Sequence, residues 1–556
     1  MSAITKIEDR VVIPAWYQSR EAARSPEIQS LSASKPVYLA HSSLNELHSD
    51  FLRAPELGKA IDLLNVAYTE GNVEKATLAA DFVIRSGRHL PSTLSGLARL
   101  VLNQSEFKEL LNPSIKAAHQ IRDKRIWLKA HPADSLSWID LSRLYMSIGE
   151  TDAAERAIRI GLKLADSNRW ATRVASRFYY NLDEYDKAHF ILLKHPDIKT
   201  DPWLLSAELA VASGADRPSR HWNNAKRALE LGYDARHVSE LQSSVASIEL
   251  MSGGLKKAKK LFKESLDWPN ANVLAQAKWA EKKGRIGLVT AGTLEKQNKA
   301  YEAKFLDAYA RQDMELALKY GKKWIEEEPF SAEPAIQTSY IASLLDRYEE
   351  AAEISSNGLK INHHDETLQL NLIFSLVALA EMNGTTADYD FINAALSRIE
   401  SMLKSDNKTI VGHALANLGL IHYRQNNIDD GKLFYEKAIS ILKSLNHPSA
   451  VLAELNHLRE SLISEAPWKE GLFLRLESLA GTGGFWDEPS VSFYLRKLGK
   501  IRENASNWRK LLTEQDPSGI NVGKTEENKD PSEGFMFDFD PKKPTIWLPR
   551  NKNGLK

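Results

Sequence analysis

One short segment of the 556-residue sequence has the residue types of a phosphate-binding loop. Three residues lie between Gly519 and Gly523, and Lys524 and Thr525 follow, whereas a phosphate-binding loop has four residues between its two glycines. That loop also needs a strand before it and a helix after it, so that backbone N–H groups converge on the phosphates. The sequence predicts neither neighbour here. We therefore predict no nucleotide site in this segment.

The sequence also has no motif typical of a metal site or of a catalytic nucleophile. The chain has no cysteine, which excludes disulfides, thiolate zinc sites and cysteine nucleophiles. His363 and His364 are adjacent and would lie on different sides of a helix, and His41 and His48 lack the four-residue spacing that points two imidazoles at one metal. No G-x-S-x-G motif marks a serine nucleophile. We therefore predict no catalytic residue, no metal site and no cofactor, and a protein that is not an enzyme.

Basic side chains form one conspicuous cluster. Lys256, Lys260 and Lys263 share one face of a predicted helix, because residues four and seven apart align on a helix. Two interpretations stay open: the solvated face of an ordinary helix, or a stripe that contacts phosphates. Lys plus Arg and Asp plus Glu are both 73, so no bulk field favours nucleic acid or an anionic membrane.

The elements that would position any functional side chain repeat along the chain. Ala188 follows Ala154 by 34 residues, and Ala351 follows Ala317 by the same interval. This period is typical of helix-turn-helix arrays, in which each helix pair needs a stacked neighbour to bury its apolar face. The repeated small residues would allow two helices to cross closely. The sequence therefore predicts an all-α repeat fold.

The clearest unit, residues 135–168, resembles a tetratricopeptide repeat. Its matching positions are Trp138, Leu141, Tyr145, Ala154 and Ile158. Ser142 stands where the family usually has glycine, and is still small. Leu418 and Gly419, followed by Ala438, are similar to another copy. The resemblance implies a right-handed α-solenoid of stacked helix-turn-helix repeats with a disordered C-terminal tail.

We divide the chain into four parts on this basis. Residues 1–54 are expected to form an N-terminal arm or cap, because terminal repeats need their exposed apolar face covered. Residues 55–465 are the predicted solenoid and residues 466–514 the predicted C-terminal capping helices. Residues 515–556 have no helical period, and are expected to be a flexible tail with aromatic islands.

The resemblance also implies where a ligand would bind. In the family, the first helix of each pair lines the concave face, which places four residues of two consecutive repeats there: Arg143, Arg173, Arg177 and Asn181. Arginine forks bind carboxylate or phosphate in bidentate fashion, so an acidic peptide or a phosphate is the expected ligand. The alternative is that these arginines pair with acidic neighbours along the array.

The C-terminal tail carries a second candidate motif. Its acidic aromatic residues and a later tryptophan are Phe535, Phe537, Asp538, Phe539, Asp540 and Trp547. This motif could recognise a partner, compete for the arginine cluster, or dock on the last helices. All three interpretations remain open from the sequence.

The function predicted from the sequence is a non-enzymatic protein–protein interaction scaffold that binds a protein or acidic peptide in a superhelical groove. The alternative is a regulatory protein that engages nucleic acid or a nuclease partner through its basic patches. We expect no membrane partner, because the most apolar stretch, residues 368–380, is too short to span a bilayer. No secretory signal is recognisable and cysteine is absent, so a cytoplasmic location is expected.

Overall fold

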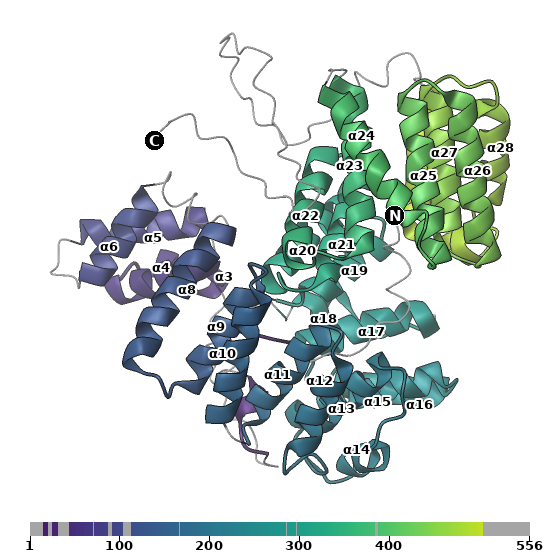
Figure 1. The fold of residues 1–556 in the computed structure, drawn as a ribbon. Helices are drawn as coiled ribbons and strands as arrows, with labels where there is room; N and C mark the ends of the chain where they lie inside the picture. Colours follow the sequence, from purple (N-terminus) through teal and green to yellow (C-terminus); the bar gives the residue numbers. More distant parts are fainter. Residues whose placement is uncertain are drawn as a thin grey trace. The chain divides into compact units, whose positions relative to one another are not determined.

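Helices are the only regular elements in the part of the chain that the structure, a computed structural model, describes (Figure 1). The described residues are 15–19, 25–31, 44–70, 72–86, 92–103, 113–165, 167–284, 286–295, 297, 299–383 and 387–503. They divide into two compact units. The N-terminal unit holds residues up to Gln242 together with 291–299, and the C-terminal unit holds 243–290 and 300–503. The expected all-α solenoid of stacked helix pairs is confirmed.

The N-terminal unit begins with a short 3-10 turn and continues as paired helices. Its elements are η2 (Pro26–Ile28), α3 (Leu44–Arg53), α4 (Leu57–Glu70), α5 (Val73–Arg85), α6 (Ser92–Leu102), α8 (Pro113–Ala130), α9 (Ser135–Met146), α10 (Thr151–Leu164), α11 (Arg169–Asn181), α12 (Tyr185–Lys194), α13 (Pro202–Gly214), α14 (Trp222–Ala228), the first half of α15 (Ala235–Met251) and α18 (Ala291–Glu295).

The C-terminal unit repeats the same plan, and its last described element is a single helix. Its elements are the second half of α15, α16 (Leu255–Ser265), α17 (Ala271–Gly284), α19 (Tyr301–Ala310), α20 (Met314–Glu327), α21 (Ala332–Leu344), α22 (Tyr348–Ile361), α23 (Glu366–Asn383), α24 (Ala387–Met402), α25 (Lys408–Arg424), α26 (Ile428–Ser444), α27 (Ser449–Ile463), α28 (Lys469–Leu479), η3 (Gly484–Asp487) and α29 (Pro489–Glu503).

Capping residues fix where the first helices of three consecutive pairs begin. Asp134 accepts a hydrogen bond from the backbone N–H of Ser137 at 3.1 Å, and Asn168 accepts one from Ala171 at 3.0 Å. Asp201 does the same at the start of α13. These side chains satisfy N–H groups that have no partner within the helix. The caps recur at nearly the repeat interval, so each pair starts in the same phase.

The small residues of the repeat lie where the two helices of a pair meet. Ala154 and Ala188 are fully buried. Ser142 Oγ donates to the carbonyl of Ala154 at 2.9 Å, and Ser176 Oγ donates to the carbonyl of Ala188 at 3.1 Å. The same contact therefore recurs one repeat later. Serine in place of the family's glycine is accommodated because its hydroxyl bonds to the facing helix.

A glycine serves the same purpose in the C-terminal unit. A Cβ atom at Gly419 in α25 would lie 2.8 Å from Cδ2 of Tyr435 and 3.0 Å from the carbonyl oxygen of Gly431, both in α26. Real Cβ atoms do not approach so closely. The helices α25 and α26 can therefore pack only because this position has no side chain.

None of the described helices is both long and apolar enough to cross a membrane.

Candidate functional site

The N-terminal segment lies on the first helices of the N-terminal unit. We call residues 15–19 and 25–31 the arm, and the surface formed by the first helices α9, α11, α13 and α15 up to Gln242 the first-helix face. Trp16 is 2% exposed and meets the ring of Phe178 edge to face, with centroids 6.1 Å apart. Its carbonyl oxygen accepts a hydrogen bond from Nε of Arg143 at 3.0 Å. The tryptophan anchors the start of the arm on α9 and α11.

Ser19 attaches the arm to α9 a second time. Its backbone N–H and its hydroxyl donate to the two carboxylate oxygens of Asp140 at 2.7 and 2.6 Å. Asp140 is buried and also pairs with Nζ of Lys124 at 2.9 Å. The carboxylate therefore keeps a cationic partner within the helices in addition to the arm.

Glu27 is the centre of the arm's contacts. It belongs to η2, and its carboxylate meets Nη1 of Arg173 at 2.5 Å. The other terminal nitrogen of Arg173 pairs with Glu240 of α15. Arg173 also lies 5.0 Å from the ring centroid of Trp203 in α13. All four side chains are buried, so one guanidinium holds two carboxylates out of solvent, one from the arm and one from the helices.

The backbone of the arm is bound by a further arginine. Nη1 of Arg169, at the start of α11, donates to the carbonyl oxygens of Glu27 at 2.5 Å and Gln29 at 3.1 Å. Its Nε pairs with Asp201 at 2.5 Å. Arg236 of α15 donates to the side-chain oxygen of Gln29 at 3.2 Å. Arginine thus contacts three main-chain carbonyls and one carboxylate of the arm, so charge-assisted hydrogen bonds hold both its backbone and its glutamate.

Burial and charge act against each other at this ion cluster. Burial raises the pKa of Glu27 above its ordinary value, Arg173 opposes that shift, and Glu240 adds to it. Burial by itself would lower the pKa of Arg173, but Glu240 and Glu27 raise it above its ordinary value. The guanidinium therefore stays charged, while the arm carboxylate is less acidic than a free glutamate.

The structure brings the predicted arginines together and adds residues that the sequence analysis missed. Arg143, Arg173 and Arg177 are all buried on α9 and α11. Asn181 lies half-buried at the end of α11, and its Nδ2 has no hydrogen-bond partner among the described residues. Arg169 was missed although it precedes Arg173 by four residues, a spacing that places both on one helical face. Whether these residues bind a ligand stays a prediction.

No local signal in the sequence points to the other missed residues. Glu27 and Trp16 lie more than a hundred residues from the arginines that they contact. Glu240 belongs to a helix two pairs further along the chain from α11. Only the stacking of the repeats brings them together. The predicted tail motif Phe535–Asp540, and Trp547, lie outside the described residues.

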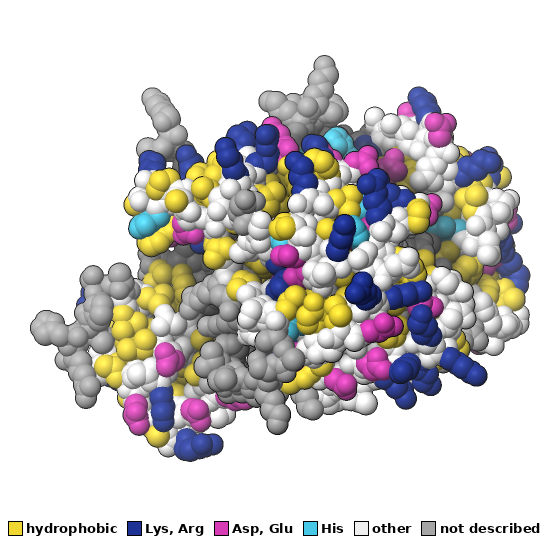
Figure 2. All heavy atoms as spheres, turned by 90° about the horizontal axis from the view of Figure 1, so that it is seen from below, with side chains coloured by type: hydrophobic (Ala, Val, Ile, Leu, Met, Phe, Trp, Pro, Cys, Tyr) yellow, Lys and Arg dark blue, Asp and Glu magenta, His cyan; other side chains and the backbone are white. Residues whose placement is uncertain are grey.

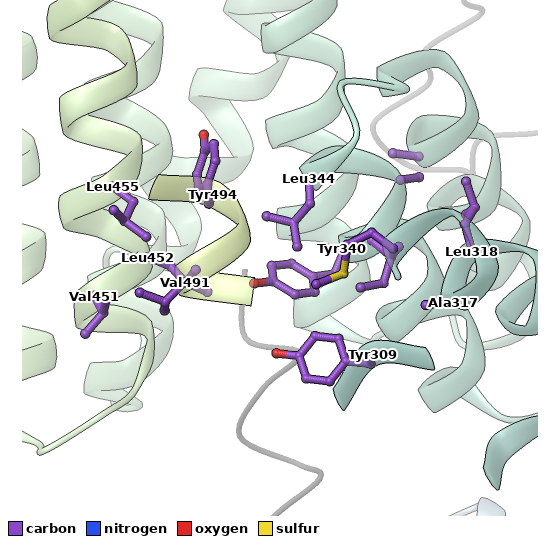
Figure 3. Close-up of a cluster of buried hydrophobic side chains, with 14 of the residues drawn as sticks. Tyr309, Ala317, Leu318, Tyr340, Leu344, Val451, Leu452, Leu455, Val491 and Tyr494 are labelled. Carbon is purple, nitrogen blue, oxygen red and sulfur yellow. The ribbon is translucent and has the colours of Figure 1, made fainter. Parts of the chain in front are cut away.

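In the C-terminal unit, the helix α29 lies on the first helices α19, α21 and α27. Figure 3 shows Val491 and Tyr494 of α29 between Leu452 of α27 and Tyr340 and Leu344 of α21. These five side chains belong to one buried apolar cluster. This face is therefore covered by a packed helix.

Polar contacts hold the start and the middle of α29. Tyr309 of α19 donates to Oγ of Ser490 at 2.9 Å, and Tyr494 donates to Oδ1 of Asn456 at 2.9 Å. Lys497 contacts Oδ2 of Asp346 at 2.5 Å. The hydroxyls and the ammonium group find partners within the cluster, as buried polar groups require.

No metal-binding cluster is found: among the described residues, no group of three or more His, Cys, Asp or Glu is placed to hold an ion. The polar groups of the first-helix face include arginines paired with carboxylates, Arg169 with Asp201 and Arg173 with Glu240. Their arrangement suits recognition of charge and backbone carbonyls.

A comparison with known families matches residues 412–441 to the tetratricopeptide repeat. This match falls on α25 and α26, the pair whose packing depends on Gly419. The helix pair α25 and α26 is therefore a tetratricopeptide repeat. No curated protein matches its sequence. Among solved structures, the human IFIT1 dimer with PPP-AAAA matches with 11% identity and a TM-score of 0.28, over 73% of this chain and 96% of that chain. Tetratricopeptide repeats suggest a protein-interaction scaffold.

Proposed function

We propose that this tetratricopeptide repeat protein is a non-enzymatic scaffold whose first-helix face binds an acidic segment of a partner protein. One observation carries the proposal: a segment of this chain, the arm, already lies on that face with its glutamate on Arg173. The arginines Arg143, Arg173 and Arg177 are the residues predicted to hold the ligand. Arg169 is added to them because it binds main-chain carbonyls.

The charge of the face favours a peptide over a nucleic acid. Asp140, Asp201 and Glu240 lie among the arginines and are buried with them. These three carboxylates repel every phosphate of a polyphosphate backbone, whereas a peptide with a single carboxylate and neutral carbonyls brings only one negative charge against them. On the side of the molecule shown in Figure 2, basic side chains are interspersed with acidic and apolar ones.

The basic helix α16 gives little support to a nucleic-acid ligand. Lys257 pairs with Glu249 at 2.6 Å, and Lys260 lies 3.8 Å from Glu264. Both lysines are exposed, so these pairs contribute little to stability. They nevertheless reduce the local positive field that phosphate binding would need. The nucleic-acid alternative therefore becomes an outcome of the test.

The proposal is tested by affinity purification with the full chain as bait. We expect a partner bound by the wild type to be lost from an Arg173→Lys, Arg177→Lys variant, because lysine keeps the charge but lacks the planar fork. The acidic segment of that partner, made as a synthetic peptide, should bind the variant at least about tenfold more weakly, the loss of about one charge-assisted hydrogen bond.

A Lys256→Gln, Lys260→Gln variant is the matched control and should keep the partner. The proposal fails if both double variants retain the same partners. It also fails if the retained partner is a nucleic acid whose binding falls steeply with salt and is lost with the lysines. That second result would favour the regulatory alternative.

A further inference from the structure

The arm has the contacts of a bound peptide rather than those of a core element. Trp16 is its buried apolar side chain, and Ile28 is 41% exposed. Its other contacts are polar: main-chain carbonyls and one carboxylate accept from Arg143, Arg169 and Arg173, and Ser19 donates to Asp140. Peptides that bind across helical repeats are held in this way, through polar contacts and one or two anchoring side chains.

The groups that bind the arm have second partners within the helices. Arg173 also pairs with Glu240, and Arg169 also pairs with Asp201. Leaving a buried charge without a partner costs several kcal/mol. Departure of the arm leaves each of these arginines with a carboxylate, so the face is preorganised for another ligand.

The arm can be exchanged for the same reason. Residues 32–43 separate its last described residue from α3. Removal of the arm exposes the indole of Trp16 and the carboxylate of Glu27, and breaks no helix. A ligand that offers the same two groups can take their place.

We infer that the arm is an internal ligand that occupies the place of the partner. The partner then presents a segment with an aromatic side chain followed in the chain direction by a carboxylate, in the positions of Trp16 and Glu27. The inference rests on the proposed function, and adds the features of the bound segment and the competition that regulates its access.

Competition by a tethered segment has a calculable effect. A short flexible tether gives an effective concentration of about 1 mM. An external peptide of equal intrinsic affinity must displace the arm before it can bind. Its apparent affinity for the wild type is therefore lowered by a factor equal to the effective concentration of the arm divided by the dissociation constant of the arm. Weakening the arm should therefore tighten binding of the external peptide about tenfold or more.

The experiment uses the full chain and a labelled synthetic peptide with the sequence of residues 15–31. Binding is measured by fluorescence anisotropy. We expect the peptide to bind the wild type weakly. It should bind a Glu27→Lys chain at least about tenfold more tightly, because Arg173 repels the arm of that chain. A Trp16→Ala chain, which lacks the anchor, should also bind the unaltered peptide more tightly than the wild type does.

Glu74→Lys is the matched control, because Glu74 is an exposed glutamate in the first turn of α5 and the substitution makes the same change in charge. Its binding should equal that of the wild type. Equal peptide affinities for the wild type, Glu27→Lys and Trp16→Ala chains would overturn the inference. So would a gain in the Glu74→Lys chain as large as that in the Glu27→Lys chain.

Two further results separate this inference from the proposed function. If a Glu27→Lys chain binds the peptide but captures no partner, the arm is still an internal ligand, but the proposal of an acidic partner is wrong. If the wild type and the Glu27→Lys chain capture a partner through Arg173 with equal affinity, the proposed function stands and only the competition by the arm is excluded. A wild-type dimer that dissociates on dilution and is absent from the Glu27→Lys chain would show that the arm binds a second copy, contrary to the inference.

Discussion

The two units cover their first helices with segments from opposite ends of the described chain, and the covers differ in chemistry. In the N-terminal unit, the arm is held by arginines that have second partners within the helices. In the C-terminal unit, α29 contributes Val491 and Leu498 to a buried apolar cluster. Apolar burial is lost in full when a segment leaves, whereas an ion pair with a second partner is only partly lost. The arm is therefore suited to exchange and α29 to stability.

The largest expected effect comes from removing the arginine that pairs with both buried carboxylates of the ion cluster. Arg173→Met should lower the free energy of unfolding by about 3–5 kcal/mol, because Glu27 and Glu240 would remain buried without their common cation. Glu27→Gln should lower it by only about 1 kcal/mol, since Arg173 keeps Glu240. Urea unfolding of the full chain followed by circular dichroism measures both. Equal losses would show that the arm carboxylate is as integral as the arginine.

The next effect tests the apolar cover of the C-terminal unit. Leu498 is 0% exposed within the cluster, and Leu498→Ala should cost about 2–5 kcal/mol through lost burial and the cavity left behind. Ile28→Ala in the arm is the counterpart and should change stability by less than about 0.5 kcal/mol, because Ile28 is 41% exposed. Thermal unfolding compares the two. A small loss for Leu498→Ala would mean that α29, too, is only loosely held.

A third substitution tests whether the repeat packing beneath the covers has the stated close approach. Gly419→Ala should cost about 1–3 kcal/mol, because its Cβ would overlap Tyr435 and the carbonyl of Gly431. Gly471→Ala in α28 is the matched control: nothing lies within 4 Å of its Cβ position. There the change should stabilise by about 0.5–1 kcal/mol, the gain in helix propensity. Similar melting temperatures for both variants would contradict the packing of α25 against α26.

The smallest effect is a pH dependence of the arm alone. Burial raises the pKa of Glu27 above its ordinary value when the arm is docked. Docking therefore takes up a proton. The stabilisation of the docked arm by this proton is fully present below the ordinary glutamate pKa, and it is lost as pH rises through the pKa of docked Glu27. Hydrogen exchange of residues 25–31, corrected for intrinsic rates, should show weaker protection at pH 7 than at pH 5. A Glu27→Gln chain should lose this dependence, and stronger protection at pH 7 in the wild type would reverse the assigned sign.

Much of the candidate site was predictable once the helices were known. Residues 169, 173 and 177 are spaced by four, so any helix places them on one face. The residue that Arg173 binds was not predictable, because Glu27 and Glu240 lie far from it in sequence and follow no common period. The sequence analysis considered the C-terminal tail as a ligand for these arginines, and the structure places the N-terminal arm there.

The sequence by itself determined the all-α repeat architecture, because a 34-residue period, helix caps and small crossing residues are local features that act within one helix pair. It also determined which arginines share a helical face. Only the tertiary structure decided the division into two units and the occupants of the first helices, since these depend on stacking residues far apart in sequence. The arm meets Arg173 only where η2, α11 and α15 converge. No periodicity encodes that meeting, because it arises from shape and charge complementarity over long sequence distances.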